Sequence, residues 1–246
     1  MEYMERTYRK LHRQQDLVHF QAVVKETDLD VAVLRTRFND HLVKWVENLV
    51  MEYRCPLEQY IQRHPEFAKT LKPLSPLDGA PAMAVEMAEA AKLAGTGPMA
   101  AVAGAFAQYV GKRLLGRSRE VIIENGGDIY MRCTKKRKIG IFAGQSPFSN
   151  KIALEIPPEQ SPLGICTSSG TVGHALSFGT ADAVVVLSPS AILADAVATA
   201  SANMVKDVED LQKAVDFATS IKGITGALAI KDDKMAVKGQ VRIAPL

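Results

Sequence analysis

The chain has 246 residues, of which 47% are hydrophobic, so it is long enough to bury a sizeable core. Its formal net charge of +3 is small and dispersed, which argues against a nucleic-acid-binding protein or one held on an anionic membrane. Its three cysteines lack metal-ligand spacing, and no apolar run approaches the roughly 18 residues of a membrane span. The charged N-terminus lacks the apolar stretch of a signal peptide. We therefore expect a cytoplasmic protein with no nucleic-acid or membrane partner.

The first third of the chain predicts strands followed by helices. Alternating apolar and polar residues within residues 6–35 are typical of strands. A helix capped by Asn39 should follow and end at Cys55, because the residue before Pro56 avoids helical backbone. The proline-rich residues 73–81 are the best candidate for an internal division of the domain.

The remaining elements fall into separate groups of helices and strands. Helices are predicted at 81–93, 98–115, 189–204 and 208–221, and strands at 121–124, 129–133, 139–143, 152–156, 183–187, 224–230, 235–237 and 241–243. Segregated groups favour an α+β fold with largely antiparallel sheets. We expect residues 1–246 to form a single domain. The similar layout of its two halves favours a duplicated unit.

The stretch from Gly164 to Ala200 organises the rest of the chain. Its helix can be capped by Ser188, with Pro189 at the first helical position. Asp195 and Thr199 are four residues apart on this helix, so their side chains share one face. A carboxylate and a hydroxyl placed in this way can bind one hard cation. The alternative is that Asp195 faces water and Thr199 bonds to a carbonyl of its own helix.

Two glycine-rich runs are candidates for binding an anion. The run Gly95–Gly97 precedes a helix, whose free N–H groups and dipole attract phosphate, although it also fits an ordinary loop and cap. The run Ser168–Thr171 offers hydroxyls and a backbone nest. We expect Gly95, Gly97 and the run Thr167–Gly173 to line one cleft. The small residues of the helix at 98–115 require a close neighbour, which could be a helix, a sheet or a ligand.

Three further groups could carry chemistry or serve the fold alone. In the Glu124–Asp128 turn, Asp128 can bond a ligand or simply fix the hairpin. His174 could act as a base for Ser169 or Cys166, although Cys166 lies in an apolar strand and fits a buried hydrophobe. The basic residues 135–138 are most simply a solvated hairpin tip.

The order of these sequence motifs resembles that of a known family. The runs Gly126–Ile129 and Thr167–Gly170, then His174 and the Ala194–Ala200 run, follow the order found in ApbE-like proteins, the FAD:protein FMN transferases. The chain is most similar to a cytoplasmic, uncharacterised branch of that superfamily. The resemblance covers roughly residues 95–204.

The resemblance implies two tunnelling-fold-like halves with FAD or FMN and Mg²⁺ between them. Magnesium would be held by Asp195, Thr199 and the backbone carbonyl of Ala101, which should converge. Asp128 and His174 would be the candidate catalytic residues. The implied flavin site comprises Gly95, Thr96, Gly97, Gly126, Gly127, Asp128, Thr167, Ser168, Ser169, Gly170 and Thr171.

The chain departs from the family at one site position. Gly104 stands where the family has a lysine, which removes a cation that could neutralise phosphate. We expect lysine at this position to strengthen FAD binding, unless Gly104 serves close packing. The resemblance implies a flavin transferase or an enzyme that cleaves the FAD pyrophosphate, with an acceptor protein and a homo-oligomer as possible partners. The alternative is a non-catalytic ligand-binding or assembly module.

Overall fold

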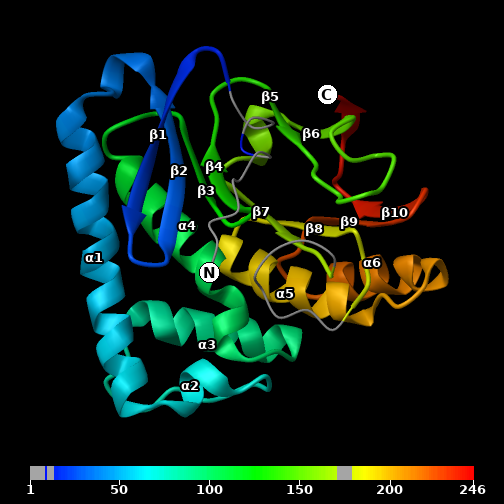
Figure 1. Cartoon of the computed structure of the whole chain (residues 1–246), viewed down its shortest axis with the longest axis horizontal. Helices are drawn as coiled ribbons and strands as arrows, with labels where there is room; N and C mark the ends of the chain where they lie inside the picture. Colours follow the sequence, from blue (N-terminus) through cyan, green and yellow to red (C-terminus); the bar gives the residue numbers. More distant parts are fainter. Residues whose placement is uncertain (1–8, 10–13, 171–178) are drawn as a thin grey trace.

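An eight-stranded antiparallel sheet carries the fold (Figure 1). The structure is a computed structural model that describes residue 9 and residues 14–170 and 179–246. In spatial order the strands are β1 (Leu17–Val24), β2 (Thr27–Leu34), β3 (Val121–Asn125), β4 (Asp128–Arg132), β7 (Leu163–Ser168), β8 (Ala183–Ser188), β9 (Gly226–Lys231) and β10 (Lys234–Gly239). Strands from both halves of the chain thus share one sheet. The predicted α+β fold with largely antiparallel sheets is confirmed.

A smaller sheet covers one face of the large one. It consists of β11 (Ile243–Pro245), β6 (Ile152–Ile156) and β5 (Arg137–Gly140), again antiparallel. Buried side chains between the two sheets, such as Ile129, Leu154 and Leu163, form one hydrophobic core. Alternate residues of the central strands therefore face this core, as the period of two in a strand requires.

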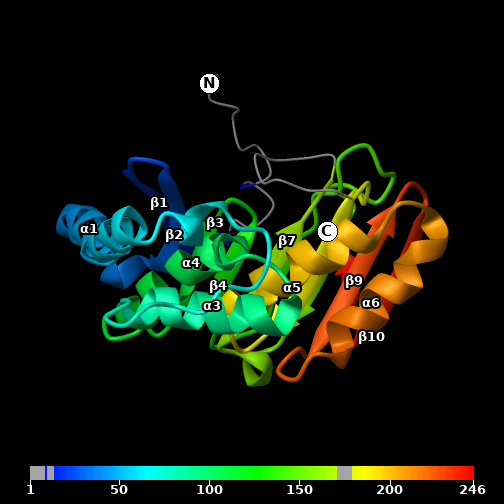
Figure 2. The same ribbon diagram turned by 90° about the horizontal axis from the view of Figure 1, so that it is seen from below.

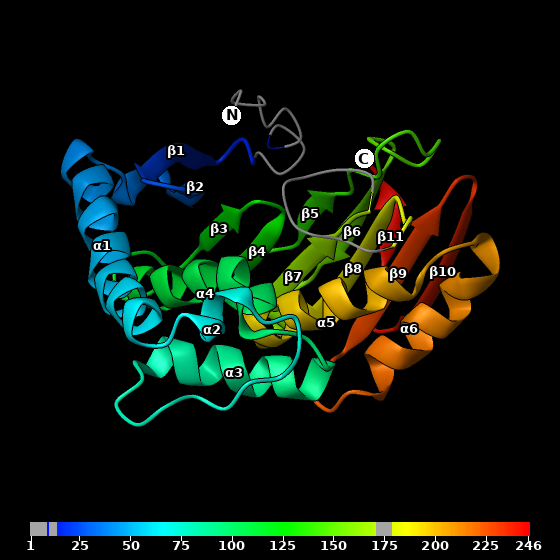
Figure 3. The ribbon, with the colours of Figure 1, turned by 60° about the horizontal axis from the view of Figure 1, so that its bottom comes forward.

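The helices gather on the other face of the large sheet (Figures 2 and 3). They are α1 (Asp40–Arg63), α2 (Glu66–Lys69), α3 (Ala82–Ala94), α4 (Val102–Leu114), α5 (Ala191–Met204) and α6 (Leu211–Ser220), with short 3₁₀ turns η2 (Arg35–Arg37), η3 (Pro98–Ala101), η4 (Pro158–Gln160) and η5 (Val208–Asp210). Residues 73–81 connect α2 to α3. In the described part of the chain, no helix is both long and apolar enough to cross a membrane.

The helix α1 corrects one predicted boundary. Asn39 does cap it, accepting a bond of 3.0 Å from the backbone N–H of Leu42. The expected end at Cys55 is wrong, because α1 continues through Pro56 to Arg63. The residues after the proline include Leu57 and Tyr60, both buried in the helical core. Their burial outweighs the backbone hydrogen bond that a proline removes.

The start of α5 corrects a second predicted helix boundary. Its cap is Ser190, whose side chain accepts from the N–H of Leu193 at 3.3 Å, so Pro189 precedes the helix. Ser188 instead ends β8, and its hydroxyl donates to the carbonyl of Gly223 at 2.9 Å. Serine is a favoured N-cap residue, so Ser188 and Ser190 were both suitable by residue type. Tertiary contacts determine that Ser190 caps the helix.

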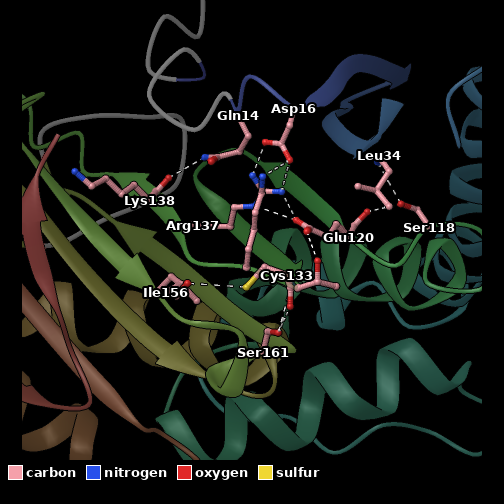
Figure 4. Close-up of polar contacts among 12 residues, drawn as sticks. Gln14, Asp16, Leu34, Ser118, Glu120, Cys133, Arg137, Lys138, Ile156 and Ser161 are labelled. Atoms are coloured by element: carbon pink, nitrogen blue, oxygen red, sulfur yellow. Dashed lines mark hydrogen bonds and ion pairs between the residues drawn. The ribbon is translucent and has the colours of Figure 1, made fainter. Parts of the chain in front are cut away.

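The basic residues 135–138 are not simply a solvated tip, because Arg137 is only 3% exposed. Figure 4 shows the Arg137 side chain pointing toward Asp16 and Glu120. Its guanidinium donates to both carboxylate oxygens of Asp16, at 2.7 and 3.0 Å, and to Glu120 at 2.9 Å. The bond from Arg137 lowers the pKa of Asp16 well below its ordinary value. This network fastens the small sheet to residues just before β1 and β3.

Candidate functional site

The site is built around the glycine turn between β3 and β4. Gly126 and Gly127 have φ values of 68° and 105°, which side chains other than glycine rarely adopt. The N–H of Gly127 donates to Glu124 at 2.7 Å, so a buried carboxylate holds the turn closed. An ideal Cβ on Gly127 would lie 3.7 Å from the carbonyl oxygen of Thr167, so the turn and the end of β7 are neighbours.

The buried Arg9 fixes the position of Glu124, whose carboxylate accepts a bond from the glycine turn. Arg9 donates to Glu124 at 2.6 Å and to Asp28 at 2.9 Å, and all three side chains are buried. Burial opposes the charge of Arg9, but the two carboxylates outweigh it and raise the pKa of Arg9 further above its ordinary value. Sequence reasoning missed this support, because Arg9 lies 115 residues before Glu124 and in no recognisable motif.

Asp128 follows the turn and lies beside Cys166. The β4–β7 register pairs Ile129 with Ile165, which sets Asp128 opposite Cys166. Asp128 is 7% exposed, and its Oδ1 atom is buried without a hydrogen-bond partner among the described residues. Burial, followed by the charge of Asp195, raises the pKa of Asp128 well above its usual range. Asp128 is therefore a buried acid with an unsatisfied oxygen.

Cys166 does not have the surroundings of a nucleophile. Its thiol is fully buried and donates to the carbonyl of Ala191 at 3.3 Å. Burial raises the pKa of Cys166 well above its ordinary value, with the charges of Asp128 and Asp195 adding to the effect. Since the thiolate is the reactive form, this environment disfavours a role in covalent catalysis. The expectation of a buried hydrophobe is confirmed.

Asp195 lies in the interior and not on a solvated helix face. It is 8% exposed, and its Oδ2 accepts from the N–H of Gly104 at 2.8 Å, in the first turn of α4. Burial raises the pKa of Asp195 to about 7, although the backbone amides of Gly104 and Ala103 favour the charged form. Asp195 thereby satisfies an N-terminal amide that the helix itself leaves without a partner. The alternative in which Asp195 faces water is wrong.

Gly104 allows α4 and α5 to approach closely. An ideal Cβ on Gly104 would lie 2.9 Å from Cβ of Asp195 and would clash with the carbonyl oxygen of Ala191. A lysine therefore does not fit here, and Gly104 is a packing position. The small residues of α4 accordingly meet both a helix and the sheet, where a Cβ on Gly111 would clash with the ring of Tyr130.

The other two members of the predicted metal set lie in neighbouring elements. Ala101 ends η3 and is buried immediately before α4, and η3 packs against α5. Thr199 is half-buried one turn after Asp195 on α5. Within residues 14–170 and 179–246, no three His, Cys, Asp or Glu side chains form a metal-binding group. A set of one carboxylate, one hydroxyl and one carbonyl nevertheless consists of hard oxygen donors, which suit Mg²⁺.

The run Gly95–Gly97 has local roles in the helical layer. Gly95 ends α3 in the left-handed conformation, with φ 77°. Thr96 is 8% exposed, and its hydroxyl oxygen is buried without a partner in the described structure. A Cβ on Gly97 would clash with the carbonyl oxygen of Thr70. Close backbone packing accounts for Gly97, and a shared cleft with Ser168–Gly170 stays a prediction.

The hydroxyl-rich run begins at the end of β7. Thr167, Ser168 and Ser169 are half-buried and Gly170 is exposed. The N–H of Gly170 donates to the carbonyl of Ala181 at 2.9 Å, which fixes the chain as it leaves the strand. Thr171 and His174 lie outside the described residues.

Gln108 is a second contributor that sequence reasoning missed. Its side-chain oxygen accepts from the N–H of Ala191 at 2.8 Å and so serves the first residue of α5. The available signal was a glutamine among the small residues of a helix expected to be tightly packed. Asp195 and Gln108 thus join α4 and α5 by reciprocal bonds to the starts of the two helices.

The chain has relatives among known proteins. The chain matches the family described as "AbpE bacteria" over residues 9–241. It is 38% identical over 241 residues to a UPF0280 protein of Methanococcus maripaludis, covering 90% of this chain and 96% of that protein. It is 43% identical over 201 residues to a UPF0280 protein of Methanosphaerula palustris, covering 80% and 83%.

Two solved structures are similar in fold. They are the flavin transferase ApbE of Vibrio cholerae, with a TM-score of 0.58, and the ApbE protein of Thermotoga maritima, with a TM-score of 0.53. Each is 13% identical to this chain, and each alignment covers 91% of this chain and 96% of the other. With a family match along most of its length and this shared fold, the chain belongs to the family described as AbpE bacteria, within the ApbE-like superfamily.

Proposed function

We propose that the protein binds a flavin nucleotide, FAD or FMN, together with Mg²⁺, and acts as a flavin transferase or cleaves the FAD pyrophosphate. The observation that carries this proposal is the buried carboxylate of Asp195, bonded to the first turn of α4 and electrostatically coupled to a second buried carboxylate, Asp128. The charge of Asp195 raises the pKa of the buried Asp128, and a nearby cation would offset the negative charge of both acids. The fold shared with a flavin transferase supports the choice of ligand.

The residues that would hold Mg²⁺ are Asp195, Thr199 and the carbonyl of Ala101. When bound, the ion would supply positive charge to the pyrophosphate of the nucleotide. The chain itself supplies the positioning: Asp195 is fixed by the N–H of Gly104, and Glu124 fixes the turn that carries Asp128. With its raised pKa, Asp128 holds a proton more readily and can donate a hydrogen bond to a flavin oxygen.

The remaining parts of the proposed site would contact the flavin nucleotide. The backbone of Gly127 lies beside Thr167 at the end of β7, and the amides of this turn with the hydroxyls that follow Cys166 would offer donors to phosphate or ribose. An acceptor protein for FMN and a cytoplasmic location belong to the same proposal. The alternative is a module that binds a ligand without chemistry, in which the bond between Asp195 and Gly104 serves only to hold α4 against α5.

The first experiment identifies the ligand. Protein purified under native conditions is denatured, and the released small molecules are identified by mass spectrometry. Binding of FAD is then measured by titration calorimetry with and without Mg²⁺. We expect a flavin nucleotide to be released and FAD affinity to depend on Mg²⁺. Absence of both would contradict the proposal and leave the fold as the only property shared with flavin transferases.

The variants separate metal binding from packing. Asp195→Asn keeps an oxygen that can accept from the N–H of Gly104 but loses the charge, so it should reduce Mg²⁺-dependent FAD affinity by at least tenfold. Thr199→Val should weaken it and Thr199→Ser should preserve it, because only serine retains the hydroxyl. Equal affinities in wild type and Asp195→Asn would sink the metal assignment.

A further inference from the structure

A cavity of about 640 Å³ lies away from the proposed site. It opens between the start of β7, the end of β8, the turn η4 and residues 239–242, which lead from β10 to β11. Its volume falls within the range of about 300–1,000 Å³ typical of small-molecule pockets. The cavity is therefore large enough to hold a ligand.

This cavity is distinct from the proposed flavin site. Its floor includes Leu163 and Leu187, which belong to the core between the two sheets. Cys166, beside Asp128, belongs instead to the core under the helices. Leu163 and Ser168 mark the two ends of β7, and five residues of strand span roughly 17 Å. A ligand here would occupy the opposite face and the opposite end of the strand.

Backbone hydrogen bonds hold the walls in place. The N–H and the hydroxyl of Thr225 both donate to the carbonyl of Leu187, at 2.8 and 3.1 Å. The N–H of Gln240 donates to the carbonyl of Thr225 at 2.8 Å. On the other side, the hydroxyl of Ser161 donates to the carbonyl of Pro158 at 2.9 Å and closes η4. The cavity is thus preformed, which reduces the entropic cost of binding.

The lining combines an apolar floor with unsatisfied polar groups. Leu163, Leu187 and Val241 supply the floor. Gln160 carries a buried amide oxygen without a hydrogen-bond partner in the described structure. The Arg242 side chain is exposed at the cavity and forms no ion pair with any described residue. Its planar guanidinium is free for bidentate binding of a carboxylate or a phosphate.

We propose that this cavity binds a small molecule with an apolar body and an anionic head, either a carboxylate or a phosphate. The body lies on Leu163, Leu187 and Val241, and the head pairs with Arg242. Glu159 also lines the cavity and is exposed, so its negative charge repels such a head. Removal of the charge of Arg242 and removal of the charge of Glu159 should therefore have opposite effects on binding of the anion. The proposal does not depend on the flavin site.

The test uses the full-length protein with ¹³C-labelled leucine and valine methyl groups. Octanoate, octyl phosphate and the uncharged 1-octanol are added separately, and methyl shifts are followed by NMR. Octanoate or octyl phosphate should shift the signals of Leu163, Leu187 and Val241 and saturate, whereas 1-octanol should bind at least tenfold more weakly. Leu93, exposed on α3, is the internal control and should not shift.

The variants test the charge assignment. Arg242→Gln should weaken binding of the preferred anion by at least tenfold, a typical effect for a hydrogen bond to a charged group. Glu159→Gln should leave binding unchanged or strengthen it. The tighter of octanoate and octyl phosphate assigns the head as a carboxylate or a phosphate. Three results would overturn the proposal: no shifts at the three floor residues, equal binding of 1-octanol, or weaker binding in Glu159→Gln.

Discussion

Replacing Gly104 with alanine tests the close approach of α4 and α5 on which the proposed site depends. The new methyl group would lie 2.9 Å from Cβ of Asp195 and clash with the backbone oxygen of Ala191. Both contacts are well below the roughly 3.5–4.0 Å at which carbon atoms attract each other. Because one partner is backbone, the helices must separate, and no side-chain rotation can relieve the contact.

The expected cost is at the upper end of the range for an overpacked core, about 3 kcal/mol of unfolding free energy. For a chain of this size, each kcal/mol shifts Tm by about 2–4 °C, so Gly104→Ala should lower Tm by roughly 6–12 °C. Differential scanning calorimetry at a fixed pH measures this shift. Separation of the helices should also weaken the bond from Gly104 to Asp195 and, with it, any Mg²⁺-dependent FAD binding.

Gly116 is the matched control. It lies just after α4, its φ is not positive, and a Cβ there would come no closer than 3.4 Å to the carbonyl of Arg113. Gly116→Ala should therefore be neutral or stabilise the protein by up to about 1 kcal/mol. A Gly104→Ala variant that melts within 1 °C of the wild type would refute the packing argument and reopen this position to a larger side chain.

Two further predictions concern charged groups. The pKa of Asp195 is raised to about 7, so between the unfolded-state pKa of about 3.9 and pH 7 the folded protein binds more protons than the unfolded chain. Without metal, the free energy of unfolding should therefore fall as pH rises through this window. Asp195→Asn should flatten the profile of unfolding free energy measured by urea denaturation from pH 5 to 8. Arg137→Met leaves the buried carboxylate of Glu120 without its cation and should cost about 3–5 kcal/mol of unfolding free energy in a urea titration. Arg113→Met removes an exposed, solvent-screened pair and should leave the urea midpoint nearly unchanged.

Local patterns predicted the elements well where propensity and packing agree. The alternation in β3 and β4, the glycine turn between them and the Asn39 cap depend on neighbouring residues, and sequence carries that information. The end of α1 was wrong because proline was given its intrinsic weight, while the burial of Leu57 and Tyr60 cannot be known before the helix has a partner. The ordered runs also indicated the correct superfamily.

The site was only partly accessible from sequence, because its energetics depend on contacts between distant residues. Spacing alone places Asp195 and Thr199 on one helical face. It does not show whether that face is exposed to solvent or buried. At Gly104 the sequence leaves open a lost lysine or a packing position, and the backbone of Ala191, which is distant in sequence, decides for packing. The bond from Arg9 to Glu124, which supports the glycine turn, likewise joins residues that are distant in sequence.

The small sheet has a consequence for the order in which the chain folds. Its strands β5 and β6 come from the middle of the sequence. However, β6 pairs with β11, which follows it by more than 80 residues, and Arg137 of β5 is bonded to Asp16, which precedes β1. During synthesis, β11 leaves the ribosome after all the other described strands and helices. The helical layer can therefore form around the large sheet while one face of that sheet still lacks its complete cover. Contacts this distant in sequence form slowly, so the face lined by Ile129 and Leu163 is open to aggregation until β11 has joined the small sheet.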